Sequence, residues 1–170
     1  MSNMTIAQAL RRVKKLKGLI AEHQERAIMG VCYESTKIPA FRFNDEVAAM
    51  GSAVAEMVEL ESRIAIANAT ATVQENADCA PISLAMAIRV LQEIKGRIKF
   101  WQSLHVRTGV EKNRESDWDD NQEKSITRMV EVTWVSDVTE QEIDQKIKAL
   151  QNRFEALNNL VEDANHQVTV

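Results

Sequence analysis

TEQEIDQKIKALQNRFEALNNLVEDA, residues 139–164, is the stretch that determines the fold class. Its apolar residues lie alternately four and three positions apart over three heptads, at Ile143, Ile147, Leu150, Phe154, Leu157, Val161 and Ala164. This spacing places them on one face of an α-helix. Thr139 with Glu142 forms a capping box at the start of the stretch. The sequence therefore predicts a helix over residues 139–164.

Three further stretches show the same helical period and predict helices over residues 5–27, 44–69 and 83–107. The first begins with a second capping box, Thr5 with Gln8. Helices of this size are roughly 35 to 39 Å long, and stripes of this kind favour shallow crossing angles. We therefore expect a mainly α protein, an antiparallel bundle of four long helices.

The helix predicted over residues 44–69 is apolar around most of its circumference. Its main stripe carries Val47, Met50, Val54, Met57, Leu60 and Ile64. Outside that stripe, Val58 and Ile66 stand among several alanines. Because the helix lacks a fully polar face, we expect it to be central in the bundle or to lie against a second subunit.

Two segments have the period of a β-strand rather than a helix. Apolar and polar residues alternate over residues 126–135, and the segment 31–43 is rich in aromatic residues around Pro39. We expect these two segments to pair as a small antiparallel ribbon. A two-stranded ribbon is marginal alone, so it should pack on the bundle or extend a sheet of another chain. Residues 108–124 are polar and acidic and predict a mobile loop.

The composition limits the class of protein. The chain has 170 residues, 45% of them hydrophobic, with 5 Gly and 2 Pro. This predicts a single helical domain over residues 1–170 and excludes a turn-rich β-sandwich or barrel. The formal net charge of -4 argues against nucleic acid and anionic membranes as partners. With no signal peptide and no apolar run of spanning length, we expect a cytoplasmic protein.

The acidic segment Asp117 to Glu123 is the densest cluster of oxygen ligands. It begins like a calcium loop, but Gln122 replaces the turn glycine and Arg128 stands where a bidentate glutamate is needed. This favours a solvated loop over a weak cation site. The histidines and the two cysteines, Cys32 and Cys79, lack metal-binding spacing. We expect reduced thiols, no metal and no cofactor.

No catalytic motif is present, and the sequence favours a protein that is not an enzyme. There is no nucleophile elbow, phosphate-binding glycine loop or dinucleotide fingerprint. Basic residues cluster over 11–17 and 95–107, where an ordinary solvated helix face is favoured over an anion site and over nucleic acid.

Several short patterns resemble a septicolysin-like family of small helical bacterial and phage proteins without established activity. They are Ala9-Leu10 with Leu16, Ile20 and Arg26, then Asn68-x-Thr70, Leu84 to Leu91, and Leu157-Asn158-x-x-Val161-Glu162-x-x-Asn165. The sequence departs from the family at Ala69, Ala71 and His166. The resemblance implies a helical fold over nearly the whole chain, and the family label implies membrane damage.

Three functional hypotheses follow. The leading one is a non-catalytic protein that self-associates, because apolar residues remain after four stripes fill a bundle. The expected interface residues are Phe41, Phe43, Val58, Ile66 and Trp134. The alternative is an oligomeric module, with a phage-related role as one option, that binds a small anion such as a nucleotide at Arg26, Asn68, Thr70 and Asn165. A membrane-active protein is the third hypothesis.

Overall fold

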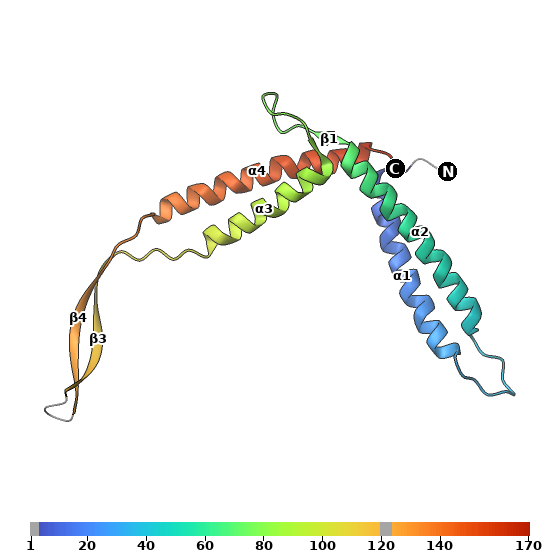
Figure 1. Ribbon diagram of the computed structural model, residues 1–170, viewed down its shortest axis with the longest axis horizontal. Helices are drawn as coiled ribbons and strands as arrows, with labels where there is room; N and C mark the ends of the chain where they lie inside the picture. The colour runs from blue at the N-terminus through green and yellow to red at the C-terminus, as the bar shows by residue number, and fades with distance from the viewer. Residues whose placement is uncertain (1–3, 120–123) are drawn as a thin grey trace. The chain divides into compact units, whose positions relative to one another are not determined.

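The computed structural model describes residues 4–119 and 124–170, which form four helices and two antiparallel two-stranded sheets (Figure 1). The helices are α1 (Ile6–Gly30), α2 (Phe43–Thr70), α3 (Leu84–Gln102) and α4 (Glu140–Gln167). The strands are β1 (Thr72–Val73) with β2 (Ile82–Ser83), and β3 (Gly109–Asp119) with β4 (Lys124–Trp134). The mainly α fold class is confirmed.

Both predicted capping boxes are present. The Thr5 hydroxyl accepts a hydrogen bond from the Gln8 backbone N–H, and the Gln8 side chain accepts one from the Thr5 N–H. Thr139 and Glu142 make the same reciprocal pair at the start of α4. These boxes satisfy backbone donors that a helix start leaves free, which is why sequence located both starts to within one residue.

Helix α3 is shorter than predicted, since it ends at Gln102 rather than near residue 107. The Ser103 hydroxyl donates a hydrogen bond to the Phe100 carbonyl at 2.7 Å. A serine hydroxyl competes for backbone carbonyls in this way and favours helix ends. Apolar residues at helical spacing continue as far as Leu104, beyond the end of the helix. Periodicity alone therefore misplaced this boundary.

The ribbon predicted between residues 31–43 and 126–135 is wrong in its pairing. The strand at 126–135 exists as β4, but its partner is β3, which lies where a mobile loop over 108–124 was expected. Residues 31–42 connect α1 to α2 and form no strand. Pairing with the neighbouring segment closes a much shorter loop and costs less chain entropy. Nearly every residue of β3 is polar, so its sequence lacks the alternation of apolar and polar residues that predicts a strand.

The chain is divided into two compact units. The first comprises Met1–Gln92 with Glu155–Val170, and the second comprises Glu93–Phe154. Helices α3 and α4 run from one unit into the other. The second unit holds their remaining halves together with the β3–β4 hairpin, and Lys95 Nζ lies 5.0 Å from the centre of the Phe154 ring there.

The first unit holds most of the core. Its fully buried large side chains are Ile6, Leu16, Leu84 and Leu157. The chain ends join the same unit, because the Ile6 N–H donates to the Val168 carbonyl and the Val170 N–H to the Met4 carbonyl, both at 2.9 Å. The core thus gathers the first half of α1, the end of α2, the start of α3 and the end of α4.

A bundle of four helices over their full length is not confirmed. On α2, the only buried residues are Leu60, Ile64 and Ala67, all in its second half. Val47 and Val54, predicted to face the core, are each 37% exposed. Helix α2 is therefore not central within this chain. Among the described residues, no helix combines the length and hydropathy that crossing a bilayer requires.

Candidate functional site

Opposite charges run along the α1–α2 pair. Helix α1 carries six Lys or Arg and two Glu, whereas α2 carries five Asp or Glu and one Arg. Arg12 binds Glu56 through two hydrogen bonds of 2.7 and 2.8 Å, and Lys17 Nζ lies 2.9 Å from Glu61. The hydrogen bond to Arg12 lowers the pKa of Glu56, and Glu56 in turn raises the pKa of Arg12. These pairs connect α1 to α2 along the outside of their contact.

The outward face of α2 carries an apolar stripe. It consists of Val47, Gly51, Val54, Val58 and Ala65, which follow one another at spacings of four, three, four and seven residues. Glu61, which pairs with Lys17 of α1, occupies the position between Val58 and Ala65 in the same row. Val58 is 56% exposed, more than Val47 and Val54. We call this set the α2 stripe. Spacings of three and four keep a row of side chains on one face, as in a coiled-coil seam.

Of the five residues predicted for an interface, three belong to α2 and are exposed: Phe43, Val58 and Ile66. They do not share one face. Ile66 is eight residues after Val58, which places it about 80° further around the helix. Val58 therefore lies in the α2 stripe and Ile66 beside it.

Phe41 lies at the loop end of the α1–α2 pair, beneath the guanidinium of Arg26, whose Cζ is 5.1 Å from the ring centre. Arg26 also pairs with Glu22 one turn earlier. The loop passes close to Gly30, where a Cβ atom would come within 2.7 Å of the Phe41 carbonyl oxygen. Arg26 and Phe41 thus close the loop against α1.

The predicted anion site is not gathered in one place within the chain. Arg26 lies near the start of α2, because the preceding turn of α1 pairs His23 with Glu46 at 2.6 Å. Asn68 is 22 residues beyond Glu46, or about 33 Å along α2 at 1.5 Å per residue. Arg26 is therefore separated from Asn68 and Thr70, and binding of a small anion stays a prediction.

At the end of α2, the hydroxyl of Thr70 is used locally, since it donates to the Ile66 carbonyl at 2.9 Å. The Oδ1 atom of Asn68 is buried and accepts no hydrogen bond within the described residues. Asn165, the fourth residue of the predicted anion site, lies in α4 and is half-buried. A buried amide oxygen requires a hydrogen-bond donor, and an anion without a hydrogen to donate cannot fill that role. The Oδ1 atom of Asn68 therefore does not suit the binding of such an anion.

Trp134, the fifth predicted interface residue, is held at the base of the β3–β4 hairpin. Its indole N–H donates to Glu111 at 3.0 Å, and the Arg107 guanidinium lies 5.5 Å from the ring centre. Trp134 is half-buried. These contacts orient its ring on the face of the hairpin that also carries Val130 and Val132.

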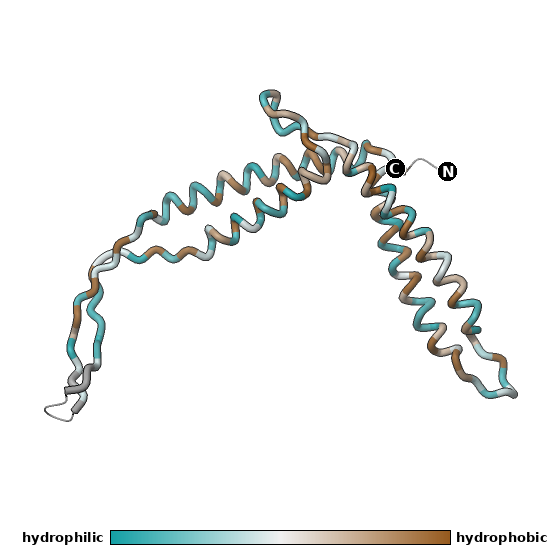
Figure 2. The backbone as a smooth tube through the Cα atoms, viewed as in Figure 1, coloured by the Kyte–Doolittle hydropathy of each residue, from teal (hydrophilic) through white to brown (hydrophobic). Residues whose placement is uncertain are grey.

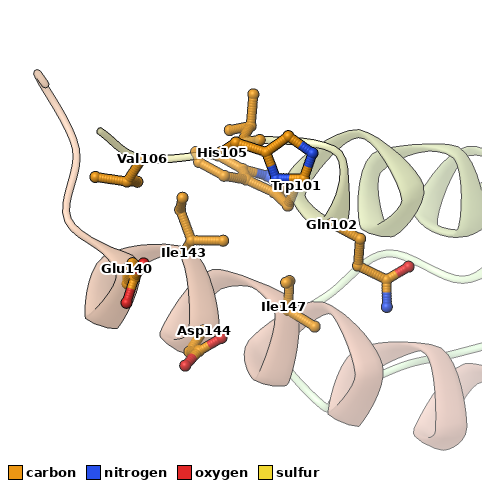
Figure 3. A pocket seen from close by; sticks show the side chains of 9 residues that line it. Trp101, Gln102, His105, Val106, Glu140, Ile143, Asp144 and Ile147 are labelled. Carbon is orange, nitrogen blue, oxygen red and sulfur yellow. The ribbon is translucent and has the colours of Figure 1, made fainter.

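A cavity of about 550 Å³ lies in the second unit between the end of α3 and the start of α4. Figure 3 shows Ile143 and Ile147 pointing toward the segment that carries Trp101 and His105, whereas Asp144 points away from it. Polar side chains also line this cavity, among them Gln102, His105 and Glu140.

No cluster of three or more His, Cys, Asp or Glu suited to a metal occurs in the part of the chain that the structure describes. Most of the predicted acidic segment, Asp117 to Glu123, lies outside the described residues or side chains. Cys32 and Cys79 are both free and exposed, so no disulfide joins them.

The sequence missed two residues that the structure exposes on the α2 stripe. Val47 and Val54 were interpreted as core because they share a helical period with Leu60 and Ile64. An ideal α-helix drifts about 20° per heptad against a 3.5-residue repeat, so a long stripe turns away from its first partner. The signal that could have found them is Gly51, a small residue in the same heptad row.

We compared the chain with known families and proteins. No family model and no curated protein sequence matches it. It is similar to a solved structure, a functionally unknown conserved protein from Corynebacterium diphtheriae, with 13% sequence identity and a TM-score of 0.66. The alignment covers 99% of each chain. At this identity, the similarity shows that the two proteins share a fold.

Proposed function

We propose that this chain is a non-catalytic protein that acts by self-association, with the α2 stripe packed against the same stripe of a second copy. The observation that carries the proposal is the exposed heptad row on α2. Val58 is 56% exposed, and Val47 and Val54 are each 37% exposed. Apolar side chains arranged at heptad spacing on an exposed helix face mark a helix-pairing surface.

A second copy fits the stripe in an antiparallel arrangement. If Gly51 faces Val54 of the second copy, then Val47 faces Val58 and Asn44 faces Glu61. The apolar layers thus pair with apolar layers, and polar residues close both ends. The small Gly51 lets the two helices approach closely where they cross. Such a contact is isologous, because each copy presents the same surface.

Light scattering coupled to size exclusion tests the proposal. We expect the wild-type chain to be dimeric or larger at tens of micromolar, and V58K to have a lower mass because two lysines would lie in the apolar seam. I66K is the matched control, since Ile66 is equally β-branched and 63% exposed on the same helix but lies outside the stripe. A monomeric wild-type chain would refute self-association. A V58K variant that associates like I66K would refute the stripe.

A further inference from the structure

The β3–β4 hairpin is a two-stranded sheet without a covering element in the described part of the chain. Its strands pair over eleven residue pairs, from Gly109 with Trp134 to Asp119 with Lys124. No third strand among the described residues joins the sheet. An isolated two-stranded hairpin is at best marginally stable in water. A hairpin of this length therefore needs a further strand or a packed surface.

The two edges of the hairpin differ. Four of the eight β3 residues from Gly109 to Ser116 are charged, whereas β4 from Thr127 to Trp134 has only Arg128 and Glu131. Figure 2 shows the same contrast, with β3 mostly hydrophilic and hydrophobic residues spaced along β4. Charged residues and prolines keep natural sheet edges from pairing. The β3 edge is protected in this way and the β4 edge is not.

We infer that the free edge of β4 pairs antiparallel with β4 of a second copy, which gives a four-stranded sheet shared by two chains. A strand edge offers a row of free N–H and C=O groups, and addition of a strand satisfies them. A two-fold axis at Val130 places Val130 opposite Val130 of the second copy. The same axis joins the half-buried apolar faces of the two hairpins, each carrying Val130, Val132 and Trp134, into one face.

The charges of β4 fit this register. With the axis at Val130, Arg128 faces Val132 of the second copy and Glu131 faces Met129, so no like charges are opposed. An axis at Arg128 or Glu131 would instead oppose two identical charges, which is destabilising. Thr127 faces Thr133, a favourable cross-strand pair. The pairing of Val130 with Val130 and of Thr127 with Thr133 thus favours this register.

Cysteine cross-linking tests the contact. Val130→Cys is made in a chain whose two exposed cysteines are replaced, Cys32→Ser and Cys79→Ser. Opposed residues of an antiparallel pair have Cα atoms about 4.5 to 5.5 Å apart, within the range that a disulfide spans. We expect mild oxidation at low micromolar concentration to convert most of this variant into a disulfide-linked dimer on a non-reducing gel.

Asn113→Cys in the same background is the matched control. Asn113 lies directly opposite Val130 within the hairpin, on the same face but on the protected strand. We expect this variant to form no disulfide-linked dimer. The double variant Asn113→Cys/Val130→Cys should close a disulfide within one chain, which shows that the hairpin is formed. If the hairpin forms and Val130→Cys links copies no more than Asn113→Cys does, the inference is refuted. That result would leave the separate contact at the α2 stripe untouched.

Discussion

Arg12 lies with its guanidinium against the carboxylate of Glu56, with Nε donating to Oε1 at 2.7 Å and Nη2 donating to Oε2 at 2.8 Å. This two-bond geometry is the strongest that a surface ion pair attains, because both hydrogen bonds are charge-assisted and the fork fixes direction. It joins the first third of α1 to the middle of α2. The face of α2 opposite this contact is the one that carries the α2 stripe.

Glu56→Gln should lower the melting temperature, because the amide can accept from only one arm of the Arg12 fork and carries no charge. The decrease should shrink in high salt, since salt screens exposed charges. Circular dichroism melts at low and high ionic strength provide the measurement. Glu59→Gln is the control on the same helix, and an equal decrease there would show that the pairing contributes nothing.

Stability should fall as the pH drops below the ordinary carboxyl range. The pKa of Glu56 is lowered by its hydrogen bond to Arg12, and that of Glu142 by its hydrogen bonds from Thr139. A carboxyl whose folded pKa is depressed contributes stability above its unfolded pKa, which is 4.5, and loses it as pH falls through the folded value. A glutamine side chain can still complete a capping box, so Glu142→Gln should flatten this pH dependence in melts between pH 3 and 7 with little effect at pH 7.

Gly30→Ala should destabilise the chain by about 1 to 3 kcal/mol, because the new Cβ would overlap the Phe41 carbonyl oxygen. Gly18→Ala is the matched control in the same helix, with no atom within 4 Å of its added Cβ. It should stabilise α1 by roughly 0.5 to 1 kcal/mol. Urea denaturation measures both changes. Equal effects would contradict the close approach at Gly30.

Gly51→Ala separates helix stability from association. The added Cβ meets no atom within 4 Å in the chain, so it should strengthen α2 by roughly 0.5 to 1 kcal/mol. In the proposed dimer the same methyl group would hold the two stripes apart. We therefore expect weaker association in sedimentation experiments despite a more stable monomer. Unchanged or tighter association would argue against a close crossing at Gly51.

Leu84→Ala should cost about 2 to 5 kcal/mol, because Leu84 is fully buried and its loss leaves a cavity. Met86→Ala, two residues further along α3, should cost much less, since Met86 is 55% exposed. The comparison, made by urea denaturation, checks that the first unit has its core at the start of α3. Similar costs at both positions would place the core elsewhere.

Local chemistry accounts for what could be read from the sequence. The capping boxes at Thr5 and Thr139 and the spacing from Ile143 to Val161 predicted the helices correctly, because helical period and caps depend on neighbours within a few residues. The hairpin was only half predicted. The alternation in β4 is visible in its own residues, but β3 alternates too little to show which segment pairs with it.

The residues of the candidate site were also predicted only in part. Val58 and Phe43 were expected on the surface because apolar residues exceeded what one bundle could bury, and both are exposed. Arg26 and Asn68 were expected together, and the antiparallel course of α1 and α2 separates them along the helix.

The sequence by itself determined the four helices and the capping boxes at Thr5 and Thr139, since each follows from residues close together along the chain. Only the tertiary structure decided which side of α2 is buried, which segment β4 pairs with, and that Val47 and Val54 stay exposed. Those outcomes depend on contacts between distant residues, such as Arg12 with Glu56, and on where the apolar core ends. A helical period specifies that a stripe exists, but not what covers it.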